Sequence, residues 1–249
     1  MLPDWITPQV QEQLIDGLVL TLAFTVVTSI GSLMAGYSAA VWRDSNSRVK
    51  KRLATMFVEL FRNVPALILV IFFAFAIPNI FPIDLRRMIF FNNPVVNTLG
   101  DIIDVPIPYY AAAAALALIL NTGAHLAEVF RSGFAAVPKS RVDAARSLGA
   151  SRTAAIRAVV APIGIRIAFP AMSNRLIHNL KNTSLASFVA VPELFQVIQG
   201  SITRTFRATE LLIFAAILYL VLSTVFTALL ALIERRLGKV QGAGEPLRV

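Results

Sequence analysis

Residues 17–42 read GLVLTLAFTVVTSIGSLMAGYSAAVW, a stretch of 26 residues without a single Asp, Glu, Lys or Arg. About 20 apolar residues in helical conformation cross a bilayer core of about 30 Å, so this stretch is long enough to span a membrane. Three more charge-free stretches follow at residues 63–83, 105–127 and 211–233. The region 167–191 is also mainly apolar, although it contains Arg175, His178 and Lys181, and we include it as a span. The sequence thus predicts five spans, at about 18–42, 55–77, 106–127, 167–190 and 211–233.

The composition of the whole chain supports a membrane location. Of its 249 residues, 57% are hydrophobic and 15% are charged, against roughly 45–50% and 25% in soluble domains. The absence of cysteine excludes disulfide scaffolds and cysteine nucleophiles, and two histidines are too few for a multi-histidine metal site. The opening residues lack the basic region and cleavage site of a signal peptide, so the first span is expected to be retained. We expect an all-α integral membrane protein with one transmembrane domain over residues 1–249 and no metal site.

The distribution of basic residues predicts the orientation of the spans. Connections on one side of the five spans carry 16 Lys and Arg residues, and those on the other side carry four. Cytoplasmic loops concentrate basic residues, which places the N-terminus outside and the C-terminus in the cytoplasm. The net charge of +9 is then mainly a signal of orientation. It leaves nucleic-acid binding as a minor alternative, and we expect the lipid bilayer and no nucleic acid as partner.

The basic loop at about 128–166 contains a candidate docking element, within the sequence AVPKSRVDAARSLGASRTAAIRAVVAPIGIR at residues 136–166. Ser140 followed by Asp143 is similar to a capping box, and Gly149 is a typical stop. These signals predict a helix from Arg141 to Leu148, with Ser151 capping the next helix. A helix of two turns is marginal in water and needs a surface to pack on. A solvated basic linker near lipid headgroups is the alternative, but it has no use for a capped helix.

The spacing of this segment carries a resemblance to a known family. Asp143, Ala144 and Ala145 are followed after three residues by Gly149 and after nine more by VVAP at 159–162. This arrangement resembles the EAA motif of permease subunits of ATP-binding-cassette (ABC) importers, with Asp in place of Glu and Ala161 in place of Leu. The resemblance implies a permease fold of the type I importers and a coupling helix that docks in a groove of the ATPase subunit. The implied ATPase-coupling residues are Arg141, Val142, Asp143, Ala144, Ala145, Arg146, Leu148 and Gly149.

Further segments resemble the branch of this family that takes up polar amino acids. They are FVELFRNVPALILVIFFAF at 57–75, AEVFRSGFAAVPKSRVDAARSLG at 127–149, HNLKNTSLASFVAVPEL at 178–194 and IERRLG at 233–238. The RNVP form at 62–65 looks closest to permeases for glutamate, glutamine and aspartate. The resemblance implies a bacterial inner-membrane subunit that works with two cytoplasmic ATP-binding subunits, a second identical or related permease subunit and an extracytoplasmic amino-acid-binding protein.

Polar residues inside the spans are candidates for the substrate path, because ionisable groups in a membrane usually face a bundle interior or an aqueous route. Asn174, His178, Lys181 and Asn182 share one helical face by their spacing. A cation there would meet the substrate carboxylate, and Glu59, Glu128 or a partner residue would meet the ammonium group. The alternatives are that Lys181 snorkels outward, that amides hold helices together, and that Glu59 pairs with Arg62. The candidates are Glu59, Arg62, Asn63, Asn121, His125, Asn174, Arg175, His178, Lys181, Asn182, Thr183 and Ser184.

Motifs for chemistry are missing from the sequence. There is no G-x-x-x-x-G-K-[ST] phosphate loop, no H-E-x-x-H and no G-x-S-x-G. We expect no catalytic residue and no cofactor in this chain, with ATP and Mg bound by the partner ATPase. A small membrane enzyme that modifies lipids and a passive channel remain as alternatives. The enzyme would act without an ATPase partner, and the channel would conduct ions without nucleotide.

Overall fold

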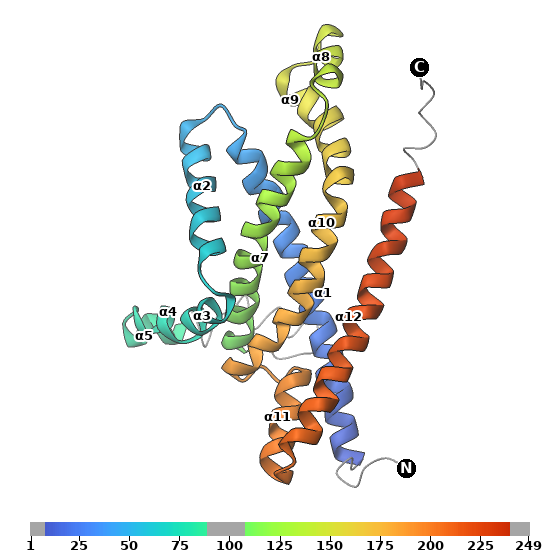
Figure 1. Ribbon diagram of the computed structural model, residues 1–249. Helices are drawn as coiled ribbons and strands as arrows, with labels where there is room; N and C mark the ends of the chain where they lie inside the picture. The colour runs from blue at the N-terminus through green and yellow to red at the C-terminus, as the bar shows by residue number, and fades with distance from the viewer. Residues whose placement is uncertain (1–7, 89–107, 240–249) are drawn as a thin grey trace.

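A computed structural model describes residues 8–88 and 108–239, and all regular secondary structure in these residues is helical. Four helices run side by side along one axis (Figure 1). They are α1 (Pro8–Arg43), α7 (Tyr109–Ala135), α10 (Ala161–Asn182) and α12 (Ala208–Lys239). Within the described ranges, each of them, α10 together with its flanking turns, is long and apolar enough to cross a membrane. The predicted all-α membrane fold is therefore confirmed.

The helices extend well beyond the charge-free stretches from which the spans were predicted. At 36 residues, α1 is about 54 Å long, and it already contains Glu12 and Asp16 before the predicted start at 18. Likewise α7 continues to Ala135 and α12 continues to Lys239, beyond the predicted ends of their spans at 127 and 233. The absence of charge marks the part of a helix suited to lipid, whereas the helix itself ends where its backbone hydrogen bonding ends.

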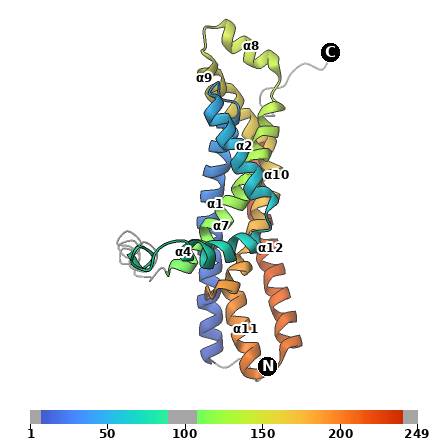
Figure 2. The same ribbon diagram turned by 90° about the vertical axis from the view of Figure 1, so that its left-hand side faces the viewer.

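The second predicted span, at 55–77, is not one straight helix. It is divided between α2 (Arg48–Asn63) and a second helical stretch from Ala66 to Asn79, and the two are bent by 106°. The break lies at Val64 and Pro65, where Val64 is extended because a residue before proline avoids the helical region. The second stretch consists of α3 (Ala66–Ile71), the π-helical η1 (Phe72–Ala76) and α4 (Ile77–Asn79), followed by α5 (Ile83–Arg86). Figure 2 shows this stretch leaving the bundle sideways.

The short helices α4 and α5 lie at the start of the loop that leads from this stretch to α7. The greater part of that loop, residues 89–107, lies outside the described residues. Within the described residues, the number of spans reaches the predicted five if α2 and the stretch after it are counted together as one bent span.

The loop predicted at 128–166 is considerably shorter than expected. Helical conformation resumes in α9 (Arg152–Ala155) and continues through the π-helical η3 (Ile156–Val160) into α10 and the 3-10 helix η4 (Thr183–Val189). Arg157 and Arg166, which fall within the predicted loop, lie in this helical stretch, because long side chains near a helix end can extend toward the membrane surface. The non-helical part is confined to the short connections on either side of α8 (Lys139–Ser147).

The connection at 192–210 contains another helix, α11 (Leu194–Thr205). Its N-cap is Glu193, whose side chain accepts a hydrogen bond from the backbone N–H of Gln196 at 2.8 Å. The same carboxylate accepts from the hydroxyl of Tyr219 on α12 at 2.7 Å and lies 3.4 Å from the hydroxyl of Thr21 on α1. Glu193 thus joins α11 to two spanning helices, and it is fully buried.

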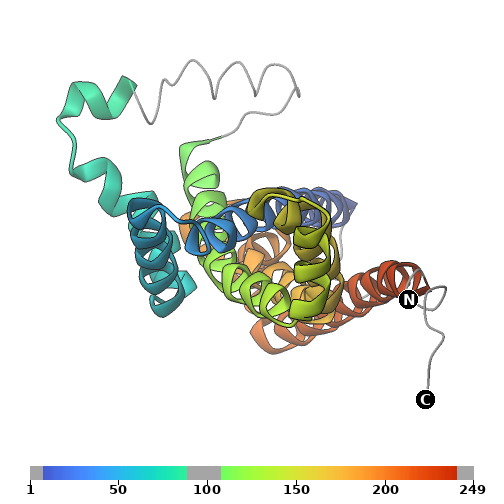
Figure 3. The same cartoon turned by 90° about the horizontal axis from the view of Figure 1, so that it is seen from above.

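Small residues allow the central helices to approach closely. A side chain at Gly36 on α1 would meet the carbonyl oxygen of Gly123 on α7 at 2.8 Å, and one at Gly133 would meet that of Gly164 on α10 at 2.4 Å. Such contacts are typical of helix pairs in membranes. Seen along the bundle axis in Figure 3, α2 and α12 lie on opposite sides of the pair formed by α7 and α10. This arrangement leaves one face of the pair uncovered between them.

The connections sort to the two ends of the bundle as the charge distribution requires. The turn between α1 and α2, the helix α8 and the end of α12 lie at one end, and the start of α1 and the junction of α11 with α12 lie at the other (Figure 1). The basic connections are therefore all at the α8 end, which we continue to expect in the cytoplasm.

Candidate transport path and coupling helix

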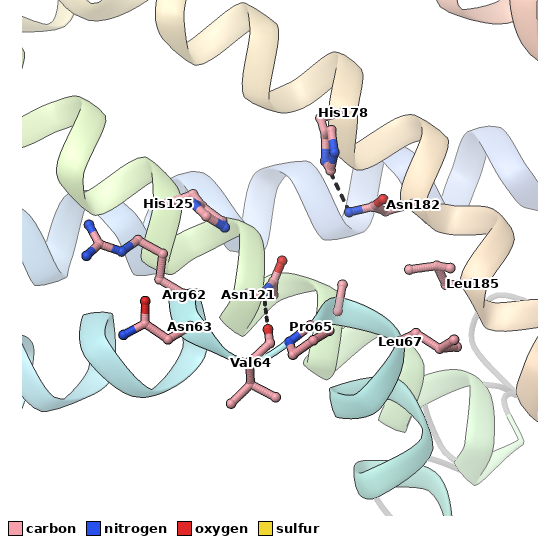
Figure 4. Close-up of a pocket in the computed structure, with 11 residues that line it drawn as sticks. Arg62, Asn63, Val64, Pro65, Leu67, Asn121, His125, His178, Asn182 and Leu185 are labelled. Atoms are coloured by element: carbon pink, nitrogen blue, oxygen red, sulfur yellow. Dashed lines mark hydrogen bonds between the residues drawn. The ribbon is translucent and has the colours of Figure 1, made fainter.

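A cavity opens where α2 breaks, on the uncovered face of the bundle. Its volume is about 400 Å³, within the roughly 300–1,000 Å³ of small-molecule sites. Polar side chains from α2, α7 and α10 point toward it (Figure 4). We call it the central cavity, and it is lined by Arg62, Asn63, Val64, Pro65, Ala66, Leu67, Asn121, His125, His178, Asn182 and Leu185.

The break in α2 leaves backbone carbonyls that need partners, because unsatisfied polar backbone groups are costly inside a membrane. Asn121 on α7 supplies them. Its side-chain amide donates to the carbonyl oxygen of Phe61 at 2.8 Å and lies 3.3 Å from that of Val64. Asn121, a candidate for the substrate path, thus makes a contact between helices and also forms part of the cavity wall.

On the opposite wall, His178 and Asn182 interact one turn apart on α10. The side-chain nitrogen of Asn182 lies 3.2 Å from Nδ1 of His178. His178 is exposed and Asn182 is half-buried, and both side chains face the opening (Figure 4). These two residues and Asn63 can offer hydrogen bonds to a polar molecule of the size of an amino acid.

A second cavity, which we call the α8-side cavity, continues toward α8. It is lined by Arg62, His125, Glu128, Val129, Ser132, Gly133, Ile167, Ala168, Ala171 and Arg175, with a volume of about 340 Å³. Arg62 and His125 line both cavities, so they mark the passage from one to the other. Of the predicted path residues, Arg175 belongs to this second cavity.

Glu128 is the centre of a cluster of three arginines. One carboxylate oxygen accepts from Arg43 at 2.6 Å and lies 3.4 Å from Nη1 of Arg62, and the other accepts from Nε of Arg131 at 2.8 Å. The cluster joins α1, α2 and α7. The alternative in which Glu59 pairs with Arg62 is therefore wrong, because the carboxylate that Arg62 contacts is that of Glu128. Among the described residues Glu59 forms no ion pair, and it lines neither cavity.

The remaining predicted path residues lie apart from these two cavities. Lys181 and Ser184 line a third, open cavity beside α12, together with Tyr219 and Ser223. Thr183 is buried and donates to the carbonyl oxygen of Leu180 at 2.7 Å. Asn174 is exposed and does not line any of the three cavities described. The residues of the predicted polar stripe on α10 are therefore divided between different surroundings.

Sequence reasoning missed a buried polar seam between α1, α7 and α10. Asn179 is fully buried, and its amide nitrogen donates to the hydroxyls of Thr28 at 2.8 Å and Ser29 at 3.2 Å. Its carbonyl oxygen accepts from the hydroxyl of Thr122 at 3.0 Å. A signal for the seam was present in α1, where hydroxyl residues recur at helical spacing. They are Thr21, Thr25, Thr28 and Ser32, and all four are buried.

The candidate coupling helix α8 stands beyond the end of the bundle (Figure 1). It runs from Lys139 to Ser147 rather than from Arg141 to Leu148, and it contains no buried residue. The capping box predicted from Ser140 and Asp143 is wrong. The residue before the helix is Pro138, and no side chain caps it.

The stop signals after α8 are confirmed by the geometry. Gly149 has a φ of +88°, a conformation that favours glycine. The hydroxyl of Ser151 accepts from the backbone N–H of Ala154 at 3.2 Å, as expected for an N-cap. Leu148 is 89% exposed. A helix this short, with no buried residue and an exposed apolar residue at its end, is marginal by itself.

The fold and these sites define a class of protein: a helical, multi-pass membrane protein with a polar cavity and a short exposed helix at one end of the bundle. In the described ranges, no cluster of acidic residues or histidines could hold a metal ion. Residues 17–239 match the family described as binding-protein-dependent transport system inner membrane component, and the chain belongs to this family. The predicted resemblance to permease subunits of ABC importers is thereby confirmed, and the chain is a translocation subunit of such a system.

Individual relatives agree with this assignment. The chain is 32% identical over 224 residues to the glutamine transport system permease protein GlnP of Escherichia coli (strain K12), covering 90% of this chain and 92% of the relative. It is 30% identical over 222 residues to the octopine transport system permease protein OccM of Rhizobium radiobacter, covering 89% of this chain and 84% of that one.

Solved structures show the same fold. A crystal structure of an amino acid ABC transporter with histidines matches with a TM-score of 0.73 and 26% identity, over 95% of this chain and 100% of that chain. The MetNI methionine ABC transporter in an inward-facing conformation matches with a TM-score of 0.69 and 17% identity, over 93% and 99%. At 17% identity, the similarity to MetNI concerns the fold alone.

Proposed function

We propose that this chain is the permease subunit of an importer for polar amino acids of the glutamine and glutamate kind. An extracytoplasmic binding protein delivers the amino acid, and the chain provides half of the path across the bacterial inner membrane. A second permease subunit, identical or related, provides the other half. Two cytoplasmic ATP-binding subunits, which bind ATP and Mg, supply the energy.

The observation that carries the proposal is α8. This nine-residue helix has no buried residue and lies beyond the bundle at the end with the basic connections. A helix of that length is marginal alone, so its conformation in the absence of core contacts indicates a surface prepared for a partner. Its sequence resembles the EAA motif, and in ABC importers the helix that carries this motif contacts the ATPase subunit.

The cavities support the nature of the cargo. Amides and imidazoles from three helices line the central cavity, and one arginine leads from it to the next. A membrane-embedded space with these groups suits a small zwitterion that needs both donors and acceptors. The relatives named for glutamine and octopine transport support the same class.

A bulky substitution on α8 tests the proposal. Ala145 is a half-buried residue of α8, and Ala145→Trp adds a large side chain to this short helix, so we expect it to prevent close approach of the ATPase subunit. We expect loss of ATPase co-purification and of ATP-dependent amino-acid uptake into vesicles. Ala208→Trp, at an exposed position of α12 at the opposite end, is the control and should retain the ATPase.

The same experiment distinguishes the alternatives. Uptake that survives Ala145→Trp with the ATPase still bound would remove the coupling role of α8. Ion conductance of the purified chain without nucleotide would favour a passive channel, and lipid turnover by the chain alone would favour a membrane enzyme.

A further inference from the structure

The two stacked cavities have an uneven charge. Among the described residues that line the central and α8-side cavities, the cations are Arg62 and Arg175, and Glu128 is the one carboxylate. That carboxylate is already occupied by arginines on both of its oxygens. The walls therefore offer positive charge to a cargo molecule and hold their negative charge in an internal cluster.

Arg62 differs from the other arginines of the cluster. Arg43 and Arg131 contact Glu128 at 2.6 and 2.8 Å and line neither cavity, whereas Arg62 is 3.4 Å away and lines both. Its guanidinium is thus the most weakly held of the three and the one within reach of cargo. Glu128 would keep two close partners if Arg62 turned away, so release of Arg62 leaves no unpaired buried charge.

From this geometry we infer that Arg62 gives up its contact with Glu128 and binds the carboxylate of the cargo instead. The path would thereby select for cargo with a free carboxylate and against cationic cargo. The inference rests on the proposed function and narrows it to a charge class. Arginine is suited to this role because its planar guanidinium binds a carboxylate through two parallel hydrogen bonds. Arg175 lies further along the α8-side cavity and offers the next cation on the same route.

The absence of cysteine from the chain provides a direct test of binding. Leu185→Cys places a single thiol on the wall of the central cavity. In the complex with the ATPase subunits, the rate of maleimide labelling at this position reports whether the cavity is occupied, without the binding protein. The ligands to compare are glutamine, glutamate, arginine and the amine that glutamine gives on removal of its α-carboxyl group.

We expect glutamine and glutamate to slow labelling, and arginine and the decarboxylated amine to have no effect at the same concentrations. In the Leu185→Cys background, Arg62→Gln should raise the half-protecting concentration of glutamine about 10- to 100-fold, as for loss of a hydrogen bond between charged groups. Arg62→Lys, which keeps the charge, should raise the half-protecting concentration of glutamine by a smaller factor. Arg131→Gln removes an arginine of the same cluster from outside the cavities and should change the value less than about threefold.

Three results would overturn the inference. The first is equal protection by the decarboxylated amine, the second is an equal effect of Arg62→Gln and Arg131→Gln, and the third is no protection by glutamine up to its solubility limit. Vesicle uptake by the unaltered importer distinguishes failure of this inference from failure of the proposed function. Uptake of a polar amino acid alongside any of these results leaves the proposed function intact, and absence of all amino-acid uptake overturns both.

Discussion

Two neighbouring asparagines of α10 meet opposite surroundings. Asn179 is fully buried and exchanges hydrogen bonds with hydroxyls on α1 and α7. Asn182 lies on the cavity side, where its contact within the described residues is the imidazole of His178. The same side chain thus fixes the bundle at one position and remains available to a ligand three residues later.

The comparison separates structural polarity from functional polarity inside a membrane. A polar group that faces other helices is satisfied by them, since lipid offers no alternative partner. A polar group that faces an open cavity keeps unused hydrogen-bonding capacity, and this capacity is what a transported molecule can use. Mutations on the two sides of α10 should accordingly affect different measurements.

The largest effect is expected where α10 meets α7 most closely. In Gly133→Ala, the added Cβ would lie 2.4 Å from the carbonyl oxygen of Gly164 and 2.7 Å from Cβ of Ala168. Neither atom can move without its helix, so we expect a loss of about 1–3 kcal/mol in the free energy of unfolding. Denaturant unfolding of the purified chain in detergent measures it.

Gly200→Ala in α11 is the matched control for this packing contact. The nearest atom to its added Cβ is Nη2 of Arg204 at 3.5 Å, at the end of a flexible side chain. We expect no loss of stability, and a gain of up to about 1 kcal/mol because alanine is the better helix former. An equal loss in both variants would show that tight helix contact is not the cause.

The next effect concerns the buried seam. Asn179→Leu removes the partner of Thr28, Ser29 and Thr122 together. The hydroxyl of Thr28 keeps its bond to the carbonyl oxygen of Phe24, so we expect a moderate loss of about 1–2 kcal/mol in unfolding free energy. Asn182→Leu should change unfolding by less than about 0.5 kcal/mol. Equal destabilisation by the two would contradict the division of α10 into two sides.

The sequence predicted the spanning helices well because their signal is local. A run of apolar residues long enough for a bilayer forms a helix whatever its neighbours are. Breaks are also local in origin, and Val64 before Pro65 was a visible warning that the second span is bent. The direction of the following stretch was not predictable, because it depends on packing against α7 and on the contact of Asn121 with the carbonyl oxygen of Phe61.

The candidate site was predicted only in part, because local spacing is visible in the sequence and contacts between distant segments are not. Residue types and spacing identified polar positions such as His178 and Asn182, which share a helical face. They could not identify the partner of Arg62, because Glu128 is distant in sequence and meets Arg62 only when α2 packs on α7. The role of Asn179 was missed because its partners are weakly polar hydroxyls on two other helices.

Removing the amide from the cavity side should affect transport rather than folding. In Asn182→Leu the wall of the central cavity loses a donor and an acceptor, and His178 loses its neighbour. We expect amino-acid uptake to fall roughly tenfold, the cost of about one hydrogen bond to a charged group, while ATPase co-purification is retained. Uptake into vesicles and pull-down of the ATPase check the two parts. Unchanged uptake would remove Asn182 from the path.

The smallest effect is expected at Asn174, which tests whether an exposed polar residue on α10 takes part in transport without lining a cavity. Asn174 belongs to the predicted stripe and is exposed, but it does not line any of the three described cavities. We expect Asn174→Ala to change the unfolding free energy by less than about 0.5 kcal/mol and uptake by less than about twofold, the equivalent factor. A loss of uptake as large as that of Asn182→Leu would show that the path follows the whole polar stripe, and the cavities would then no longer define it.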